Sequence, residues 1–329
     1  MKRNFWILLL AVFAFGFYSC DEDDDPIDVN RMETVSMGAS YANDVYYSLS
    51  DGIVAQVLRT NWDVAFSVDA MSSSILINDG AGVVLKEYPI DAGWEWLDAI
   101  DTTGFSSWTS LMNSDEDWEE GAFGQNATGH PNYGWGEYDM TSHNVVGAAL
   151  YIIKLVDNQY KQVFIEVKDE TNSEYIFKFA DLDGTNAVTE TISYDGLTSN
   201  YIYYSMTNET VVADREPDAS TWDLLFTSYM DNEIYYNVSG IKQNLGVQVI
   251  EVDNALDLTI ETYNEAEFSD DITEIGYDWK EFDMGTFQYV LDADRIYFVK
   301  DQNDHVYKIV FTGFGGSATG DFNFDITGL

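Results

Sequence analysis

The sequence predicts an all-β protein built from two tandem copies of one module, with at most one or two short helices. Aromatic residues are abundant, with 22 tyrosines and 19 phenylalanines, whereas there are only 4 prolines. Runs of aromatic and β-branched residues favour strands over helices, and no long stretch repeats its apolar residues with the period of a helix. With 329 residues, the chain has room for two domains of ordinary size.

The duplication is visible as short blocks that recur in the same order in the two halves. The blocks are a Tyr-Tyr-Ser strand (46–48 and 203–205), a Trp-Asp strand (61–66 and 221–226), an Asn- and Gly-containing loop (78–82 and 237–240), a Trp-to-Met block (135–140 and 279–284) and an aromatic strand ending in Lys (151–154 and 297–300). A shared order over this length indicates a duplicated module. We expect the Trp-Asp strand to be central in each copy, with Trp62 and Trp222 as core anchors in equivalent surroundings. Asp63 and Asp223 are expected to order a turn through local hydrogen bonds.

The middle of the first copy, residues 94–126, has no counterpart in the second. Four tryptophans lie there among Asp, Ser and Gly residues, and a short helix is expected near 108–112. In the strand that follows downstream, alternation places Val163, Ile165 and Val167 on one face.

The balance of charge excludes some classes of partner. Lys plus Arg is 15 and Asp plus Glu is 58, which gives a net charge of −43. Such a chain does not bind nucleic acid through a basic face, and it repels anionic lipid surfaces. A cation-binding role needs a specific cluster, because an acidic excess by itself indicates only a solvated surface.

The start of the chain has the pattern of a bacterial lipoprotein leader. A basic start precedes an apolar stretch at residues 5–17, which is too short to cross a bilayer. Cys20, the only cysteine, follows at the expected break and is predicted to be lipidated. The residues before it match the lipid-attachment motif loosely, so a plain signal peptide with an incidental cysteine is the alternative. The acidic run 21–25 indicates a tether that holds the folded part away from the membrane.

Taken in order, the repeated blocks resemble the HmuY-like haem-binding lipoproteins of the Bacteroidetes. The acidic run after Cys20 resembles the tag on surface-exposed lipoproteins of the same bacteria. The resemblance covers most of residues 40–329 as two tandem copies. It implies a lipoprotein signal peptide at 1–19, an acidic linker at 20–38, and HmuY-like domains at 39–196 and 197–329.

The resemblance also implies haem as the cofactor and gives candidate ligands. In the family, haem iron is held between two axial histidines. One of these positions corresponds to Met140 in the first copy and Met284 in the second, and a methionine thioether can bind haem iron. Met112 is the candidate for the other position, and His143 is close enough to Met140 to reach the same site. A haem site is therefore implied only in the first copy.

Plainer interpretations apply to several of these residues. Met140 and Met284 could be core residues at a strand end, and His130 and His305 are expected to be exposed near turns. The run 181–184 resembles a calcium loop but lacks the distal Glu, so a simple turn is expected. With three histidines, one cysteine and no nucleophile elbow, phosphate loop or zinc-protease motif, an enzyme is not expected.

The sequence and the resemblance together predict a non-enzymatic, hemophore-like lipoprotein of the cell surface. It would be anchored to the outer membrane through Cys20 and would deliver haem to a TonB-dependent outer-membrane receptor. The alternative is a surface interaction or adhesion lipoprotein of the same fold that does not bind haem, which the missing histidine pair favours. If Met140 is a ligand, the soft thioether should favour ferrous iron, and haem should bind more tightly on reduction.

Overall fold

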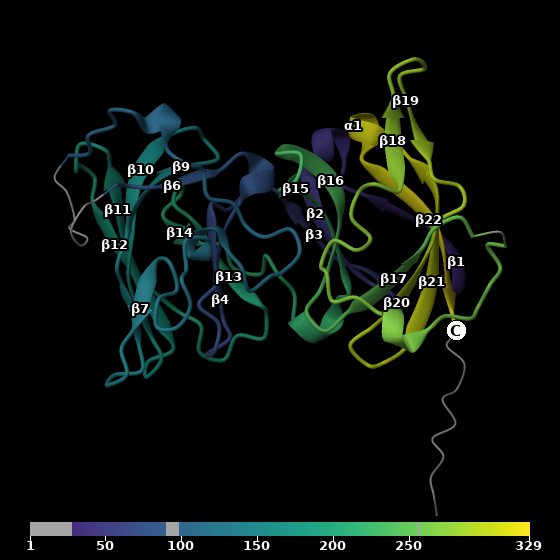
Figure 1. The fold of residues 1–329 in the computed structure, drawn as a ribbon, viewed down its shortest axis with the longest axis horizontal. Coiled ribbons are helices and arrows are strands. Elements are labelled where there is room, and N and C mark those ends of the chain that lie inside the picture. Colours follow the sequence, from purple (N-terminus) through teal and green to yellow (C-terminus); the bar gives the residue numbers. More distant parts are fainter. Residues whose placement is uncertain (1–27, 90–98, 256) are drawn as a thin grey trace, which may run out of the picture.

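The structure, a computed structural model, describes residues 28–89, 99–255 and 257–329 and is all-β, as the sequence predicts (Figure 1). The described residues form 22 strands, six three-residue 3-10 helices and one α-helix, α1 (Gly316–Thr319). The predicted signal peptide and Cys20 lie outside the described residues. Strand pairing and turns therefore make almost all of the described fold.

Two larger sheets carry most of the strands. A five-stranded sheet has the order β1 (Asn30–Ser36), β22 (Asp321–Gly328), β21 (Val306–Phe314), β20 (Ile296–Lys300) and β17 (Gln248–Val252). A seven-stranded sheet has the order β12 (Val188–Ser193), β11 (Glu174–Asp181), β10 (Tyr160–Asp169), β8 (Val145–Gly147) and β7 (Gly136–Tyr138), with β9 (Leu150–Lys154) beside β10 and β6 (Val84–Glu87) beside β9.

Three smaller sheets complete the described fold. The first four-stranded sheet has the order β14 (Thr210–Val211), β13 (Tyr201–Ser205), β4 (Val64–Ser67) and β5 (Ile75–Ile77). The second has the order β16 (Tyr236–Gln243), β15 (Leu224–Asp231), β2 (Asn43–Ser48) and β3 (Gly52–Leu58). The last sheet is the hairpin β18 (Lys280–Asp283) and β19 (Gln288–Leu291). The 3-10 helices are η1 (Ala39–Tyr41), η2 (Asp79–Ala81), η3 (Phe105–Ser107), η4 (Ala122–Gly124), η5 (Ala219–Thr221) and η6 (Glu265–Glu267).

The two four-stranded sheets are built by an exchange of strands between the repeats. β2 of the first repeat pairs with β15 of the second, so that Tyr47 lies opposite Leu224. β13, the matching strand of the second repeat, pairs with β4 of the first, so that Tyr204 lies opposite Val64. β1 joins the second half as well, because it pairs with β22. Figure 1 shows β1, β2 and β3 in the half that holds the yellow C-terminal strands, whereas β13 and β14 lie in the other half.

Backbone hydrogen bonding therefore crosses the predicted boundary between 39–196 and 197–329 in both directions. Those domain limits remain a sequence prediction, and the pairing adds that each half contains a strand of the other repeat. Each half has its own core. Phe66 packs against Phe177 in the first, with ring centroids 5.0 Å apart, and Phe226 stacks on Phe324 in the second at 6.0 Å.

The two Trp-Asp strands are central in their sheets, and their tryptophans have equivalent surroundings, as predicted. Trp62 makes an edge-to-face contact with Tyr203, with ring centroids 5.0 Å apart. Trp222 makes the same contact with Tyr46, also at 5.0 Å. Each tryptophan thus packs on a tyrosine of the other repeat. An aromatic contact of this geometry adds about 0.5–1.5 kcal/mol to the free energy of burial, so the exchange is stabilised twice.

The aspartates after the tryptophans act alike. The carboxylate of Asp63 accepts a hydrogen bond from the N–H of Thr207 at 3.1 Å. The carboxylate of Asp223 accepts one from the N–H of Leu49 at 2.8 Å. Both therefore order a turn, as predicted, but the turn is the one that follows the exchanged strand of the other repeat.

The loop asparagines that match are Asn78 and Asn244, and the predicted match of Asn78 with Asn237 is wrong. Asn78 Nδ2 donates to the carbonyl oxygen of Trp62 at 2.9 Å, and Asn244 Nδ2 donates to that of Trp222 at 2.7 Å. Asn237 instead lies on β16. The β15–β16 hairpin is longer than the β4–β5 hairpin, which moves the loop asparagine further along the second repeat.

The short helix expected near 108–112 is absent from this described stretch. A 3-10 turn ends at Ser107, and Leu111 forms an isolated β-bridge with Leu85. Leu111 is buried in the first core, so its pairing with the edge strand β6 prevails over the local tendency to form a turn.

The face predicted for the strand at 160–169 is correct only in its first part. Val163 and Ile165 are buried, but a β-bulge between Ile165 and Val167 shifts the alternation. Lys168 then faces inward, 1% exposed, and its ammonium group donates to three backbone carbonyls between residues 69 and 72. The buried charge is tolerated because those carbonyls and the carboxylate of Glu170, 2.9 Å away, satisfy it.

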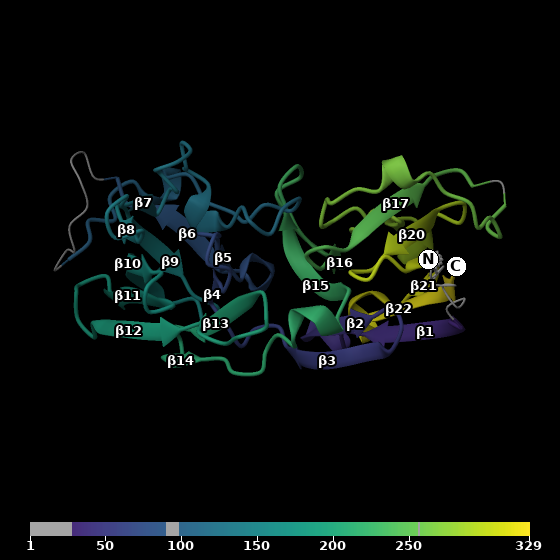
Figure 2. The ribbon, with the colours of Figure 1, turned by 90° about the horizontal axis from the view of Figure 1, so that it is seen from below.

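The insertion of the first repeat joins the two halves, and Figure 2 shows loops of the first half reaching β15. The indole N–H of Trp118 donates to the carbonyl oxygen of Gln243 at 2.7 Å. The carbonyl oxygen of Trp118 accepts from the hydroxyl of Tyr201 at 2.5 Å. Lys242 places its ammonium group 5.2 Å from the Trp118 ring. Trp118 thus joins β13, which lies in the first half, to β16 of the second half.

A buried ion pair lies at the same junction. Arg215 is 3% exposed and pairs with Asp44, which is 2% exposed. The guanidinium also donates to the carbonyl oxygen of Leu58 at 2.9 Å and lies 5.3 Å from the ring of Trp62 and 5.0 Å from that of Tyr203. The pair connects β2 with the segment after β14, so the junction is held by charge as well as by aromatic packing.

Candidate functional site

The predicted ligands Met140 and His143 lie at the turn of the β7–β8 hairpin. Trp135 is fully buried at the base of this hairpin, and its indole N–H donates to a backbone carbonyl at 2.9 Å. At the turn, the N–H of His143 donates to the carbonyl oxygen of Asp139 at 2.8 Å. The N–H of Thr141 donates to the Asp139 carboxylate at 2.7 Å and lowers the pKa of that carboxyl. The turn leaves Met140 78% exposed, so it is not the core residue of the alternative interpretation.

Two histidines and two tyrosines meet beside this turn, and we call them the histidine–tyrosine cluster (His130, Tyr133, Tyr138 and His143). The hydroxyl oxygen of Tyr138 and Nδ1 of His143 are 2.6 Å apart. His130 packs on the same tyrosine, with ring centroids 5.2 Å apart. Nδ1 of His130 is 3.2 Å from the hydroxyl oxygen of Tyr133. Tyr138 therefore links the two imidazoles.

Both imidazoles are held in the way that suits a metal ligand. Each uses Nδ1 for a tyrosine hydroxyl, and within the described residues neither Nε2 has a hydrogen-bond partner. When Nδ1 donates its proton to the tyrosine oxygen, Nε2 carries the free lone pair. A hydrogen bond on the second nitrogen is what usually orients a metal-binding histidine. The exposed thioether of Met140 adds a third group able to bind iron.

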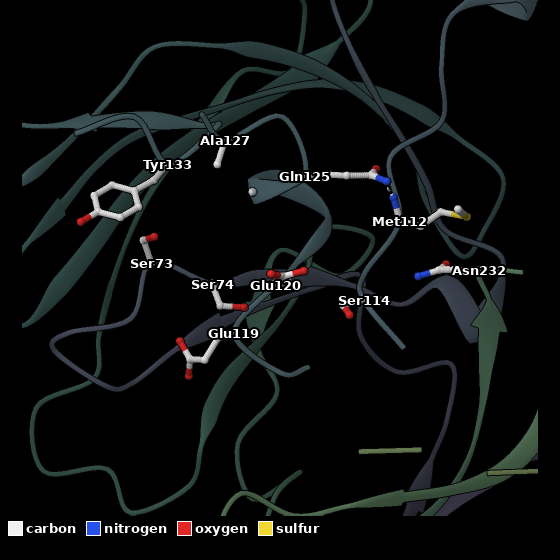
Figure 3. Close-up of a pocket in the computed structure, with 11 residues that line it drawn as sticks. Ser73, Ser74, Met112, Ser114, Glu119, Glu120, Gln125, Ala127, Tyr133 and Asn232 are labelled. Carbon is white, nitrogen blue, oxygen red and sulfur yellow. Dashed lines mark hydrogen bonds between the residues drawn. The ribbon is translucent and has the colours of Figure 1, made fainter. Parts of the chain in front are cut away.

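Met112 lies elsewhere, in a pocket of about 340 Å³. The pocket is lined by Ser73, Ser74, Met112, Ser114, Glu119, Glu120, Gly124, Gln125, Ala127, Tyr133 and Asn232. Figure 3 shows Met112 and Asn232 at one end of this pocket and Tyr133 at the other, with the Tyr133 hydroxyl pointing away from the remaining residues. Serines, carboxylates and amides dominate the lining, which suits a hydrogen-bonding ligand better than a flat apolar macrocycle.

Met140 and His143 thus lie in one turn, whereas Met112 lies in a pocket that reaches the histidine–tyrosine cluster only at Tyr133, at its other end. The Met112 backbone N–H donates to Gln125 Oε1 at 2.9 Å. His130 is the functional candidate that the sequence did not connect with the others. It stands in an irregular loop, and strand periodicity does not give the path of such a loop. The only available signal was the gathering of His and Tyr residues between 130 and 143.

The matching hairpin of the second half, β18–β19, has a different tip. Met284 is 72% exposed, so the core interpretation is excluded for it as well. Phe287 is 73% exposed and Phe282 is 41% exposed, and this hairpin has no histidine. Figure 1 shows the hairpin projecting from its half of the molecule. Its chemistry is that of an apolar contact surface rather than of an iron ligand.

The remaining candidates have structural roles. Nδ1 of His305 is 3.1 Å from the carboxylate of Asp301, at the turn after β20. The run 181–184 is a turn closed by a hydrogen bond from the N–H of Gly184 to the carbonyl oxygen of Asp181 at 2.9 Å. In the part of the chain that the structure describes, no group of three or more His, Cys, Asp or Glu residues could hold a metal ion. The same part contains no helix long and apolar enough to span a membrane.

Known proteins resemble this chain only weakly. No protein-family model matches it, and no curated protein matches it either. One solved structure, a candidate HmuY-like heme-binding protein from Bacteroides vulgatus, is 12% identical over 48% of this chain and 93% of its own, with a TM-score of 0.24. Another, a candidate lipoprotein from Bacteroides fragilis, is 13% identical over 59% of this chain and 95% of its own, with a TM-score of 0.22. The site must therefore be interpreted from its own geometry.

Proposed function

We propose that the protein is a non-enzymatic surface lipoprotein that binds haem at the β7–β8 hairpin of its first half. The observation that supports this most directly is the histidine–tyrosine cluster, in which His130 and His143 both pack on Tyr138, with Met140 exposed in the same turn as His143. Imidazole nitrogen and thioether sulfur are the axial ligands that haem iron accepts most often in binding and electron-transfer proteins.

Each residue has a defined part in this proposal. Met140 would hold the haem iron, and His143 would compete with it from the same turn. His130 supplies an imidazole from the neighbouring loop, and the two tyrosines fix the tautomers through Nδ1. Met112 would hold haem only in the pocket of Figure 3. The anchor is Cys20, and the partner that accepts the haem is an outer-membrane receptor of the TonB-dependent kind.

Titration of the purified protein with haem, first oxidised and then reduced, tests the proposal. Binding shifts the Soret band, and a thioether ligand makes the shift appear at lower haem concentration in the ferrous state. We expect Met140→Ala to remove that preference for ferrous haem, and His143→Ala to weaken binding in both states. Met284→Ala and His305→Ala are the matched controls, because they remove the same groups from the second half.

Two outcomes would count against the proposal. A Soret band that does not move in either oxidation state would exclude haem. A shift that survives the changes at Met140, His143 and His130 but is lost in Met112→Ala would move the haem to the pocket of Figure 3. The anchor is tested separately, because Cys20→Ala should release the protein from the membrane fraction.

An interaction or adhesion role is the second candidate, and the β18–β19 hairpin supports it. Met284, Phe287 and Val290 are 72%, 73% and 55% exposed, and apolar side chains gathered on a projecting hairpin are typical of contact surfaces. Under this function, cells that display Phe287→Ser should adhere less to protein-coated surfaces than cells that display the wild type. Equal adhesion, together with a positive haem titration, would exclude it.

A further inference from the structure

An acidic cleft opens where the insertion of the first repeat meets the second half. Its volume is about 480 Å³, and the β15–β16 turn and the segment 271–278 form two of its sides. Eight carboxylates line it: Asp115, Glu116, Asp231, Glu233, Glu251, Asp271, Glu274 and Asp278. No lysine or arginine is among the described lining residues. Arg295 lies beside the cleft and pairs with Glu251 at 3.3 Å and Asp278 at 2.9 Å. Two buried lysines also act on lining carboxylates, Lys242 on Asp115 and Asp271, and Lys280 on Asp278. Three cations therefore face eight carboxylates.

Burial makes an unpaired negative charge costly in this cleft. Desolvation raises the pKa of Glu251 to about 7, even though Arg295 acts in the opposite direction. Desolvation also raises the pKa of Glu274. An unpaired negative charge is therefore costly at these carboxylates, and an added ammonium group would relieve that cost.

Tyr229 gives an independent indication of a ligand. It is 4% exposed, and the ammonium group of Lys242 lies 4.8 Å from the centre of its ring. Its hydroxyl forms no hydrogen bond with any described residue, and it is not among the fully enclosed polar atoms, so it is open to the cleft. The hydroxyl reaches the cleft wall, since a Cβ added at the lining residue Gly276 would lie 3.5 Å from its oxygen.

We propose that this cleft binds a small organic polycation of the polyamine class, with one ammonium group donating to the Tyr229 hydroxyl and the others lying among the carboxylates. The volume is in the range of small-molecule sites, roughly 300–1,000 Å³. The carboxylates are spread along the cleft, and the described residues contain no group of three that could hold a metal ion. Separated ammonium groups on a flexible chain match that spread better than one divalent cation.

The insertion and the second repeat build the cleft together. Both carboxylate oxygens of Asp115 accept from Asn232, at 2.9 Å each, which fixes the insertion against the β15–β16 turn. The N–H of Ile272 donates to the carbonyl oxygen of Glu116 at 3.1 Å. The site therefore requires the segment that the second repeat lacks, and it is independent of the haem proposal.

Calorimetric titration of the full chain with spermidine tests the inference. At about 150 mM salt, long-range attraction is screened beyond about 8 Å, so saturable binding of one spermidine per chain reports a local site. We expect the Glu233→Gln/Glu274→Gln pair to weaken binding at least tenfold. Tyr229→Phe keeps the ring over Lys242 and removes only the hydroxyl, and we expect it to weaken binding about threefold to tenfold, as for the loss of one hydrogen bond.

The control variant removes the same number of carboxylate charges outside the cleft. Glu209→Gln/Asp195→Asn neutralises two exposed carboxylates outside the cleft and should leave the affinity unchanged. An equal loss in both pairs, or a titration that does not saturate, would overturn the proposal in favour of general charge attraction. Displacement of spermidine by millimolar Mg²⁺ or Ca²⁺ at constant ionic strength would overturn it in favour of a metal site. Circular dichroism of each variant confirms that it is folded.

Discussion

The two Trp-to-Met hairpins have the same frame and different tips. Trp135 and Trp279 are both fully buried at the base, and Met140 and Met284 are both exposed at the turn. The first tip is surrounded by histidines and tyrosines, whereas the second carries exposed phenylalanines. The residues that the repeats share therefore build the scaffold, and the residues by which they differ carry the chemistry.

The residue after each tryptophan explains why the first hairpin lies in a sheet and the second does not. In the first half it is Gly136, where an added Cβ would lie 2.8 Å from the carbonyl oxygen of Val146, because β7 is packed into the seven-stranded sheet. In the second half it is Lys280, 8% exposed, whose ammonium group donates to the carbonyl oxygen of Ser239 at 2.8 Å. β18 pairs only with β19 among the described strands, so there is room for a side chain. The second hairpin thus projects, whereas the first is part of a sheet.

Separating the halves is the most severe test of the comparison. Because β1, β2 and β3 complete the second half and β13 completes the first, a fragment of residues 28–196, which includes β1, should remain unfolded alone. The same holds for a fragment of residues 197–329. Mixing the two should restore the β-sheet circular dichroism of the full chain. Cooperative unfolding of either fragment alone would show that the strand exchange is dispensable.

Breaking the junction ion pair should have the next largest effect. Arg215→Met leaves the carboxylate of Asp44 buried without its charge partner, and such a loss costs about 3–5 kcal/mol. The double variant Asp44→Asn/Arg215→Met should recover much of that loss, because no unpaired charge remains. Urea unfolding of the two single variants and the double variant gives the coupling energy. A coupling energy near zero would mean that Arg215 acts only through its packing on Trp62 and Tyr203.

Acidification should stabilise the junction and both halves. Burial raises the pKa of Glu216 at the junction to about 7, and it raises those of Asp79 and Asp223 to about 6. In the unfolded chain these groups titrate near their ordinary values, so between about pH 4.5 and 7 the folded state holds protons that the unfolded state has lost. The free energy of unfolding should therefore fall as the pH rises through this window, by up to about 3 kcal/mol for Glu216.

Urea unfolding at pH 5 and pH 7.5 measures this difference. Glu216→Gln removes the titrating group and should reduce the slope, while the contributions of Asp79 and Asp223 remain. A protein that becomes more stable as the pH rises from 5 to 7.5 would contradict the assignment. Asp79 also lies at the junction, where Lys242 and the backbone of Met230 act on it, so the change in slope reports Glu216 alone.

The sequence predicted the repeated central strands but not which strands pair with each other. The repeated Trp62 and Trp222, with the aspartates that follow, predicted two central strands in equivalent surroundings, and local pattern was sufficient for that. The exchange of β2 and β13 could not be predicted, because a strand pairs equally well with its own repeat or with the other copy when the two sequences are alike. The bulge before Val167 was also hidden, since alternation continues in the sequence where the ladder shifts.

The candidate site was predictable only in part, for a related reason. Met140 and His143 are near each other in the sequence, so their proximity at one turn could be expected. The contact of His130 with Tyr138 depends on the path of the loop before β7, and the separation of Met112 depends on how the insertion folds over the first half. Neither path follows from periodicity, because loops are shaped by contacts that lie far away in the sequence.

The smallest expected effect concerns the two exposed methionines at the hairpin turns. Met140→Ser and Met284→Ser should each change the free energy of unfolding by no more than about 0.5 kcal/mol, because the side chains are 78% and 72% exposed. The double variant should show the sum of the two changes, since the hairpins belong to separate sheets. Urea unfolding gives all three values. A loss above about 1 kcal/mol in Met140→Ser alone would show that this thioether packs on the histidine–tyrosine cluster, and then haem titrations of Met140 variants would need to be corrected for stability.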